Sequence, residues 1–288
     1  MYLYPSRVVC EGTFEIRITH ENFDPLPAQI EEQVGQIWEQ IKQRDPGIPD
    51  TRLFCAKSIT ANRDTIQIVC GPSSRKYLKG TTHQSLMHIE DRFMHRGISM
   101  LAITLTSDDY VVLGMREAAT TYPLCRHAAP AGRLEVREGN PRNGVYTEYE
   151  QELAITRDEI RHMVCIGVVA DMTYSSQSFE FIFLCRLSLD AEAVANRYHA
   201  MVRDKEYQEL EIFPWNPRFI KNVVMREPRN FPPTGYTGLA LALRHEFGTD
   251  AFPIAWEPTH TSYEEFTSFQ QNMITNLLGS RKNLSPKK

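Results

Sequence analysis

The sequence predicts an α+β fold, in which strands and helices are mixed along the chain. Three observations support this prediction. Strand-like segments often follow each other without an intervening helix, and the helical segments at 27–43 and 144–155 carry an apolar face. The 288 residues are 42% hydrophobic and 24% charged, as in an ordinary globular protein. A chain of this length suffices for one large domain or two smaller ones with a sizeable core.

The first third of the chain predicts two helices and three strands. Residues 7–19 alternate as a strand does, and apolar residues recur at helical spacing over residues 27–43, which begin with proline. Two strands are expected at 51–59 and 65–71, joined by a turn. Residues 73–97 read as helical, with an interruption near the glycine at position 80.

The rest of the chain continues the mixture of strands and helices. In chain order we expect strands at 98–105 and 109–115, a Pro/Gly/Ala-rich passage at 123–144, a helix at about 144–155, strands at 163–170 and 178–187, a helix at 190–202 with Asp190 as N-cap, a strand at 206–214, and helices at 217–225, 235–247 and 262–279.

The net charge of −4 argues against a dedicated nucleic-acid-binding protein, which usually has a basic surplus. No apolar run approaches the roughly 20 residues that cross a bilayer, and the N-terminus does not resemble a secretory signal. The six cysteines are widely spaced without a CxxC pair, which argues against zinc and indicates reduced thiols in the core. We therefore expect a cytoplasmic protein with no nucleic-acid or membrane partner.

The expected helix at 144–155 places two carboxylates on one face. Val145, Tyr149 and Leu153 form a core stripe, whereas Glu148 and Glu152 lie four residues apart on a different face. Like charges at this spacing destabilise a helix by a few tenths of a kcal/mol. Binding of a hard cation such as Mg²⁺, which prefers oxygen ligands, explains the pair. A solvated acidic face is the alternative explanation.

The loop before this helix supplies more carboxylates, at Glu135 and Glu138. Together, AGRLEVRE (131–138) and TEYEQELAI (147–155) resemble the signature of the Nudix hydrolase family, G-x5-E-x7-R-E-U-x-E-E-x-G-U, where U is a bulky aliphatic residue. The connecting loop is one residue longer here. Four positions depart from the family pattern: Thr147 stands in place of Arg, Gln151 in place of the first Glu of the pair, and Ala154 and Arg137 in place of Gly.

The chain up to about residue 245 is also similar to the UDP-glucose pyrophosphatase branch of this family. The segments that carry the resemblance are IWEQIKQRDP, GPSSRKYLKGTTHQS, SDDYVVLGMRE and SFEFIFLCRLSLDAEAV. The resemblance implies a Nudix α/β/α sandwich with a mixed sheet at 96–250. An α+β N-terminal extension at 1–95 precedes it, and a C-terminal helix with a disordered basic tail follows at 251–288.

The same resemblance implies Mg²⁺-dependent hydrolysis of a nucleoside diphosphate substrate. UDP-glucose or UDP-galactose would give UMP and a hexose 1-phosphate, with Mn²⁺ as a possible substitute ion. Glu148 and Glu152 are the expected catalytic residues and metal ligands, and Glu138 and the carbonyl of Gly132 are further expected ligands. Carboxylates gathered in this way repel a diphosphate until a cation lies between them, so the acidity of the chain suits a metal-dependent enzyme.

Four other residues are candidates for substrate binding. Arg116 follows the strand at 109–115, and its guanidinium suits a phosphate; a surface arginine at a strand end is the alternative. Lys79, Gly80 and Thr81 combine a charge with a close backbone approach. The alternative there is an ordinary helix C-terminus, with Gly after the last turn and Lys within it.

Two other functions stay open from the sequence. The first is a catalytically weak or inactive Nudix-fold binding protein, which the loss of a carboxylate at Gln151 and of the Arg at Thr147 would favour. The second is a Nudix hydrolase that acts on another diphosphate, such as a dinucleotide, a CoA or a prenyl diphosphate. The sequence indicates neither the oligomeric state nor the base of the substrate.

Overall fold

The computed structural model describes residues 6–86, 88–117, 122, 124–171, 178–202 and 206–252. The predicted helix at 262–279 and the basic tail lie outside these ranges. No helix within them is both long and apolar enough to cross a membrane.

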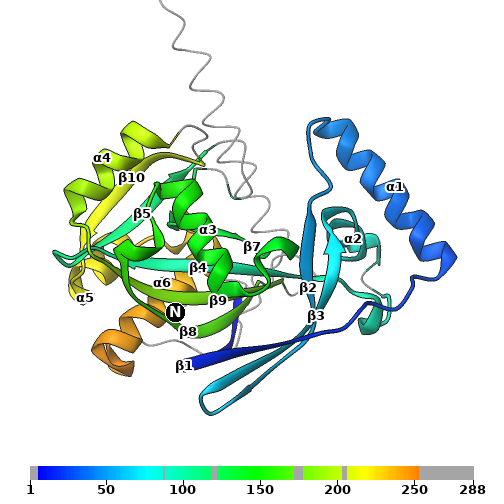
Figure 1. Cartoon of the computed structure of the whole chain (residues 1–288), viewed down its shortest axis with the longest axis horizontal. Helices are drawn as coiled ribbons and strands as arrows, with labels where there is room; N and C mark the ends of the chain where they lie inside the picture. The colour runs from blue at the N-terminus through cyan, green and yellow to red at the C-terminus, as the bar shows by residue number, and fades with distance from the viewer. Residues whose placement is uncertain are drawn as a thin grey trace, which may run out of the picture.

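The described residues form one mixed sheet of ten strands (Figure 1). β4 pairs in parallel with β9, which continues antiparallel to β8 and then β1. On its other side β4 pairs antiparallel with β5, which leads to β10. The bounds of these strands are Ser6–His20 for β1, Arg96–Leu105 for β4, Tyr110–Arg116 for β5, Ile160–Asp171 for β8, Ser178–Leu187 for β9 and Tyr207–Pro214 for β10.

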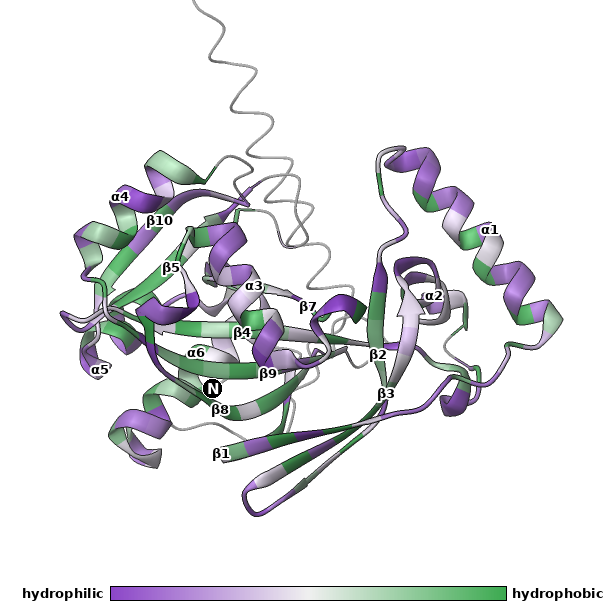
Figure 2. Ribbon diagram, viewed as in Figure 1, coloured by the Kyte–Doolittle hydropathy of each residue, from purple (hydrophilic) through white to green (hydrophobic). Residues whose placement is uncertain are grey.

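Successive side chains along a strand point to opposite faces of the sheet. Neighbouring apolar residues along β4 are buried, so both faces of the sheet are covered. Met100 belongs to the core cluster that contains α3 (Pro141–Leu153) and α4 (Ala191–Met201). Its neighbour Leu101 belongs to the cluster that contains α6 (Pro233–Phe247). These helix–sheet–helix layers confirm the predicted α+β fold with a mixed sheet, and Figure 2 shows β8 and β9 as largely apolar.

The N-terminal extension is joined to this sheet through β1, which has two sets of partners. Its first half pairs with β8, and its second half pairs in parallel with β3 (Thr65–Ser74). β3 is antiparallel to β2 (Arg52–Asn62), which in turn pairs with the first residues of β4. Two helices, α1 (Ala28–Arg44) and α2 (Arg75–Thr81), pack against each other beside these strands (Figure 1).

The predicted helical region at 73–97 is shorter than expected. α2 ends at Thr81, and two 3-10 turns follow at Gln84–Leu86 and Asp91–Phe93. The hydroxyl groups of Thr81 and Thr82 donate to the carbonyls of Tyr77 and Leu78. Such side-chain bonds to carbonyls of the preceding turn compete with continuation of a helix. The predicted helix at 217–225 is likewise a short α-helical turn, α5 (Pro217–Phe219), followed by one π-helical turn.

The predicted state of the cysteines is confirmed. All six are free thiols; Cys10 is half-buried and the other five are buried. Burial raises the pKa of Cys55 and Cys185 to about 12, so these thiols are inert core residues.

Candidate active site

Helix α3 carries the two predicted carboxylates, and its ends are well defined. It begins at Pro141, three residues earlier than predicted. Asn140 is the N-cap, and its side chain accepts a 3.0 Å hydrogen bond from the Asn143 N–H. Proline suits the first helical position, where its missing N–H costs nothing. The last helical residue is Leu153, and the C-cap that follows, Ala154, has a φ of 55°. This is the conformation that a glycine adopts readily after a helix, so Ala154 performs the structural role of the missing Gly.

Glu148 lies directly against Gly132 of strand β7 (Ala131–Arg133). A Cβ atom on Gly132 would lie only 1.6 Å from Oε1 of Glu148, so the carboxylate occupies the space of the absent side chain. Burial, together with the charges of Glu138, Glu206 and Glu135, raises the pKa of Glu148 to about 8. A cation placed among these groups would relieve both effects.

Glu152 is the most buried of these carboxylates, at 5% exposure. Its Oε2 accepts 3.0 Å hydrogen bonds from the Ala131 N–H and from the hydroxyl of Tyr207. Its Oε1 is buried and has no hydrogen-bond partner. Burial and the charge of Glu148 raise the pKa of Glu152 well above its ordinary value. A buried carboxylate oxygen without a donor is costly, unless a cation or an ordered water satisfies it.

Glu138 is also buried, and a local motif orients it. It is the last residue of a 3-10 turn, Val136–Glu138, and its Oε2 accepts a 2.7 Å hydrogen bond from the Glu135 N–H in a capping box. Burial raises its pKa. Glu138 contributes to the raised pKa of Glu148, so the loop carboxylate and the helix carboxylate belong to one electrostatic cluster.

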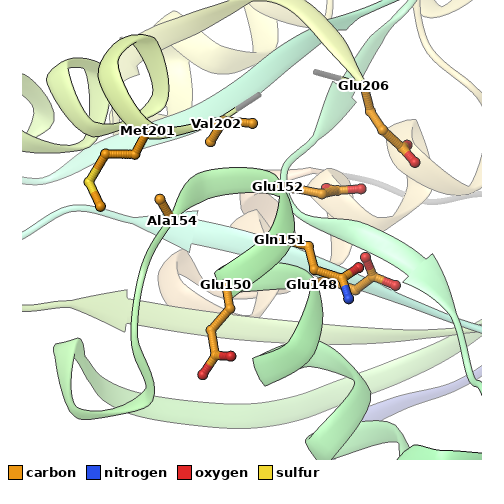
Figure 3. A pocket seen from close by; sticks show the side chains of 8 residues that line it. All are labelled: Glu148, Glu150, Gln151, Glu152, Ala154, Met201, Val202 and Glu206. Atoms are coloured by element: carbon orange, nitrogen blue, oxygen red, sulfur yellow. The ribbon is translucent and has the colours of Figure 1, made fainter. Parts of the chain in front are cut away.

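A pocket of about 460 Å³ opens over the last turns of α3. Figure 3 shows Glu148 and Glu152 with Gln151 between them, whereas Glu150 points away. Glu206, which sequence reasoning did not single out, precedes β10 and reaches this pocket from the other side. The lining residues are Glu148, Glu150, Gln151, Glu152, Ala154, Met201, Val202 and Glu206.

The donor set fits a hard divalent cation. No three His, Cys, Asp or Glu side chains within the described ranges form a preassembled metal site. The charged groups that line the pocket are nevertheless all carboxylates, and one of their oxygens is buried without a partner. Carboxylates and backbone carbonyls are the ligands of Mg²⁺ and Mn²⁺, so Glu148 and Glu152, with Glu138 beside them, are the residues that would hold such an ion.

The predicted substrate-binding residues lie in two places outside the pocket lining. Arg116 ends β5 opposite Tyr207 of β10. Burial raises the pKa of Tyr207 well above its ordinary value, and the charge of Arg116 offsets part of that rise. Gly80 contacts α1, because a Cβ there would lie 2.6 Å from Cγ1 of Val34. Thr81 is fully buried, and its hydroxyl accepts a hydrogen bond from the His95 N–H. Their contact with a substrate stays a prediction, as does that of Lys79 on α2.

The chain was compared with known proteins. No protein-family model and no curated protein sequence matches it. Among solved structures, it is similar to a Nudix hydrolase from Nitrosomonas europaea, with 15% identity, a TM-score of 0.37, and coverage of 51% of this chain and 88% of that one. It is also similar to a Nudix hydrolase from M. smegmatis, with 14% identity, a TM-score of 0.35, and coverage of 56% and 89%.

A third similar structure is a bifunctional NMN adenylyltransferase/ADP ribose pyrophosphatase from Francisella tularensis, complexed with AMP and a Mn ion. It has 13% identity and a TM-score of 0.38, and the alignment covers 52% of this chain and 42% of that one. Because all of these TM-scores are below 0.5, they assign no activity to this chain. The functional proposal therefore rests on the site itself.

Proposed function

We propose that the protein is a Nudix-type hydrolase that cleaves the diphosphate of a small nucleoside diphosphate derivative with the help of Mg²⁺. One observation carries the proposal: Glu152, which lines an acidic pocket beside Glu148, has a buried carboxylate oxygen without a partner. A structural carboxylate would be satisfied by donors on both oxygens. The segments around it also carry the resemblance to the Nudix signature.

The residues of the site have distinct roles in this proposal. Glu148 and Glu152 would hold the metal, and Glu138 would serve as a further ligand or orient a water beside it. A bound divalent cation neutralises phosphate charge and lowers the pKa of water. Glu152 is the candidate for orienting the attacking water. That water attacks phosphorus as the bond from phosphorus to the bridging oxygen breaks, so each product leaves with one phosphate.

The finer proposal is that the substrate is UDP-glucose or UDP-galactose, with UMP and a hexose 1-phosphate as products. It rests on the resemblance of the chain to the UDP-glucose pyrophosphatase branch. Mn²⁺ would serve in place of Mg²⁺, since both ions prefer oxygen ligands. A cytoplasmic location is part of the same proposal.

The second candidate function is binding without catalysis. Gln151 is exposed at the pocket and carries no charge, and the hydroxyl of Thr147 is bonded to the Asn143 carbonyl in the position where the family has Arg. Gln151 lowers the negative charge available for a cation, and Thr147 lacks the guanidinium that the family has at its position. This function predicts that the protein binds nucleotide sugars but does not release UMP from them.

The test is release of UMP from UDP-glucose, measured with and without Mg²⁺, for the wild type and for Glu148→Gln and Glu152→Gln. We expect each variant to lose at least about a hundredfold in kcat, the scale of a lost metal ligand or metal-orienting group. Glu192→Gln is the matched control, because Glu192 is an exposed glutamate in the first turn of α4 outside the pocket. Full activity in both site variants would overturn the metal assignment. Binding without turnover would select the second function.

A further inference from the structure

Glu206 lies across the acidic pocket from the two predicted metal ligands, and the proposed function gives it no role. It lines the same pocket as Glu148 and Glu152 but belongs to a distant segment, directly before β10. Figure 3 shows its carboxylate on the same side of α3 as the carboxylates of Glu148 and Glu152, whereas Glu150 points away from them. The pocket therefore contains a third carboxylate that is not part of the helix.

The contacts of neighbouring residues fix the backbone of Glu206 in this place. Its carbonyl accepts a 3.0 Å hydrogen bond from the N–H of Glu117, the residue after β5. The next residue, Tyr207, is fully buried, and its hydroxyl donates a 3.0 Å hydrogen bond to Oε2 of Glu152. The carbonyl of Tyr207 accepts a hydrogen bond from the hydroxyl of Tyr198 in α4. The backbone at Glu206 is thus held beside the last turn of α3, while its side chain is exposed.

The charges at the pocket are all of one sign. Among the described residues that line it, none is basic and four are glutamates. The charge of Glu206 contributes to the raised pKa of both Glu148 and Glu152, so its carboxylate is close enough to repel them. Oε1 of Glu152 is buried at this pocket without a hydrogen-bond partner. Carboxylates that repel one another around an unsatisfied oxygen are expected where a cation binds.

The helix supplies only two charges to this face, because Gln151, which lies between Glu148 and Glu152, is uncharged (Figure 3). The affinity of a site for a divalent cation rises with the number of charged ligands, so a third carboxylate would strengthen binding. The carboxylates of the described residues form no preassembled metal group, so Glu206 must approach α3 when an ion binds. Because its side chain is exposed, this movement removes nothing from the packed core.

We propose that Glu206 is a further ligand of the divalent cation and supplies, from the segment before β10, the third negative charge that α3 lacks at Gln151. The inference rests on the proposed metal-dependent function. An ion bound by residues of both segments would link α3 to the chain before β10. Loss of the charge at position 206 should therefore weaken ion binding, and a carboxylate introduced at position 151 should compensate for that loss.

The test is a calorimetric titration of the metal-free full chain with Mn²⁺, without substrate. We expect Glu206→Gln to bind Mn²⁺ at least about tenfold more weakly than the wild type. Addition of Gln151→Glu to Glu206→Gln should restore the affinity to within about threefold of the wild-type value.

Glu150→Gln is the matched control, because it removes the same charge from the same pocket at a side chain that points away. Its Mn²⁺ affinity should change by less than about twofold, since solvent and salt screen an exposed charge that does not contact the ion. Glu206 and Glu150 are both exposed, so neither substitution should change the urea concentration at the midpoint of unfolding.

The outcomes separate this inference from the proposed function. Wild-type Mn²⁺ affinity in Glu206→Gln, or an equal loss in Glu150→Gln, would overturn the ligand role of Glu206 even if UMP is released from UDP-glucose. A double variant that binds no better than Glu206→Gln would overturn the compensation for Gln151. Failure of the proposed function would instead appear as an absence of UMP release while the loss in Glu206→Gln and its recovery persist. If the wild type does not bind Mn²⁺, the inference is wrong, and UMP release decides the proposed function separately.

Discussion

The hydroxyl of Tyr207 donates a 3.0 Å hydrogen bond to Oε2 of Glu152 and so joins the first residue of β10 to the last turn of α3. The ring of Tyr207 is held in place by Gly114, where a Cβ would lie 2.2 Å from a ring carbon. Glu152 is thereby fixed through one oxygen, and its other oxygen is left for a ligand.

Tyr207→Phe removes this donor while keeping the ring. Oε2 of Glu152 then keeps only the Ala131 N–H. We expect a loss of about 1 kcal/mol in the free energy of unfolding and a several-fold decrease in kcat, as the orientation of Glu152 becomes looser. Urea unfolding and UMP release measure the two effects. Tyr146→Phe on the same helix α3 is the control, and equal effects in both variants would contradict a positioning role for Tyr207.

Gly132→Ala tests the contact between β7 and Glu148. The added methyl group would lie 1.6 Å from the carboxylate oxygen, so Glu148 must move. We expect destabilisation by about 1–3 kcal/mol, as for other overpacked sites, together with weaker Mg²⁺ binding in a calorimetric titration. Gly35→Ala in α1 is the control, because the added carbon would meet no atom of another part of the structure within 4 Å. Replacing this helical glycine by alanine should slightly stabilise the protein. Wild-type Mg²⁺ affinity in Gly132→Ala would exclude Glu148 as a ligand.

The pH dependence of stability should report the raised pKa of Glu148. In the metal-free protein this pKa lies near 8, against an ordinary value of 4.5. Between these values the folded state binds more protons than the unfolded state, so the contribution of Glu148 is present at low pH and is lost as pH rises toward 8. We expect the difference in unfolding free energy between the wild type and Glu148→Gln to fall from pH 5 to pH 8. A difference that is constant with pH would contradict a buried, crowded carboxyl at this position.

Mg²⁺ binding should release protons at neutral pH. Because Glu148 is largely protonated near pH 7 in the absence of a cation, it must lose its proton to become a ligand. Calorimetric titrations in two buffers of different ionisation enthalpy measure the number released. We expect fewer protons to be released by Glu148→Gln. Identical proton release by both proteins would place the ion elsewhere.

Gln151→Glu restores the carboxylate that the family signature has at this position. Gln151 is exposed and lines the acidic pocket three residues after Glu148. We expect Mg²⁺ affinity to rise about threefold or more, since the ligand charge increases, with little change in stability at this exposed position. A decrease in affinity would show that Gln151 does not face the ion.

The sequence predicted the parts of the site that lie within one helix. Helical periodicity separates the buried stripe of Val145, Tyr149 and Leu153 from Glu148 and Glu152, and the structure buries all three stripe residues. Local patterns of this kind depend only on the 3.6-residue repeat.

The missing parts come from distant segments of the chain. Tyr207 lies 55 residues after Glu152 and meets it only because β10 pairs with β5 beside α3. Glu206 enters the pocket for the same reason. In residues 73–97 the apolar pattern suggested one longer helix, whereas the threonine side chains after α2 bond to its carbonyls. The position of Tyr207 and Glu206 depends on pairing between distant strands, and the end of α2 depends on side chains that bond to its carbonyls. The apolar periodicity of the sequence contains neither kind of information.

The double pairing of β1 has a consequence for solubility. β8 has β9 on one side and β1 on the other, so β1 is what covers its second edge. Deletion of the N-terminal extension would expose the backbone N–H and C=O groups of a long apolar strand, and such an edge is a template for association with another chain. The extension therefore protects the protein from intermolecular strand pairing.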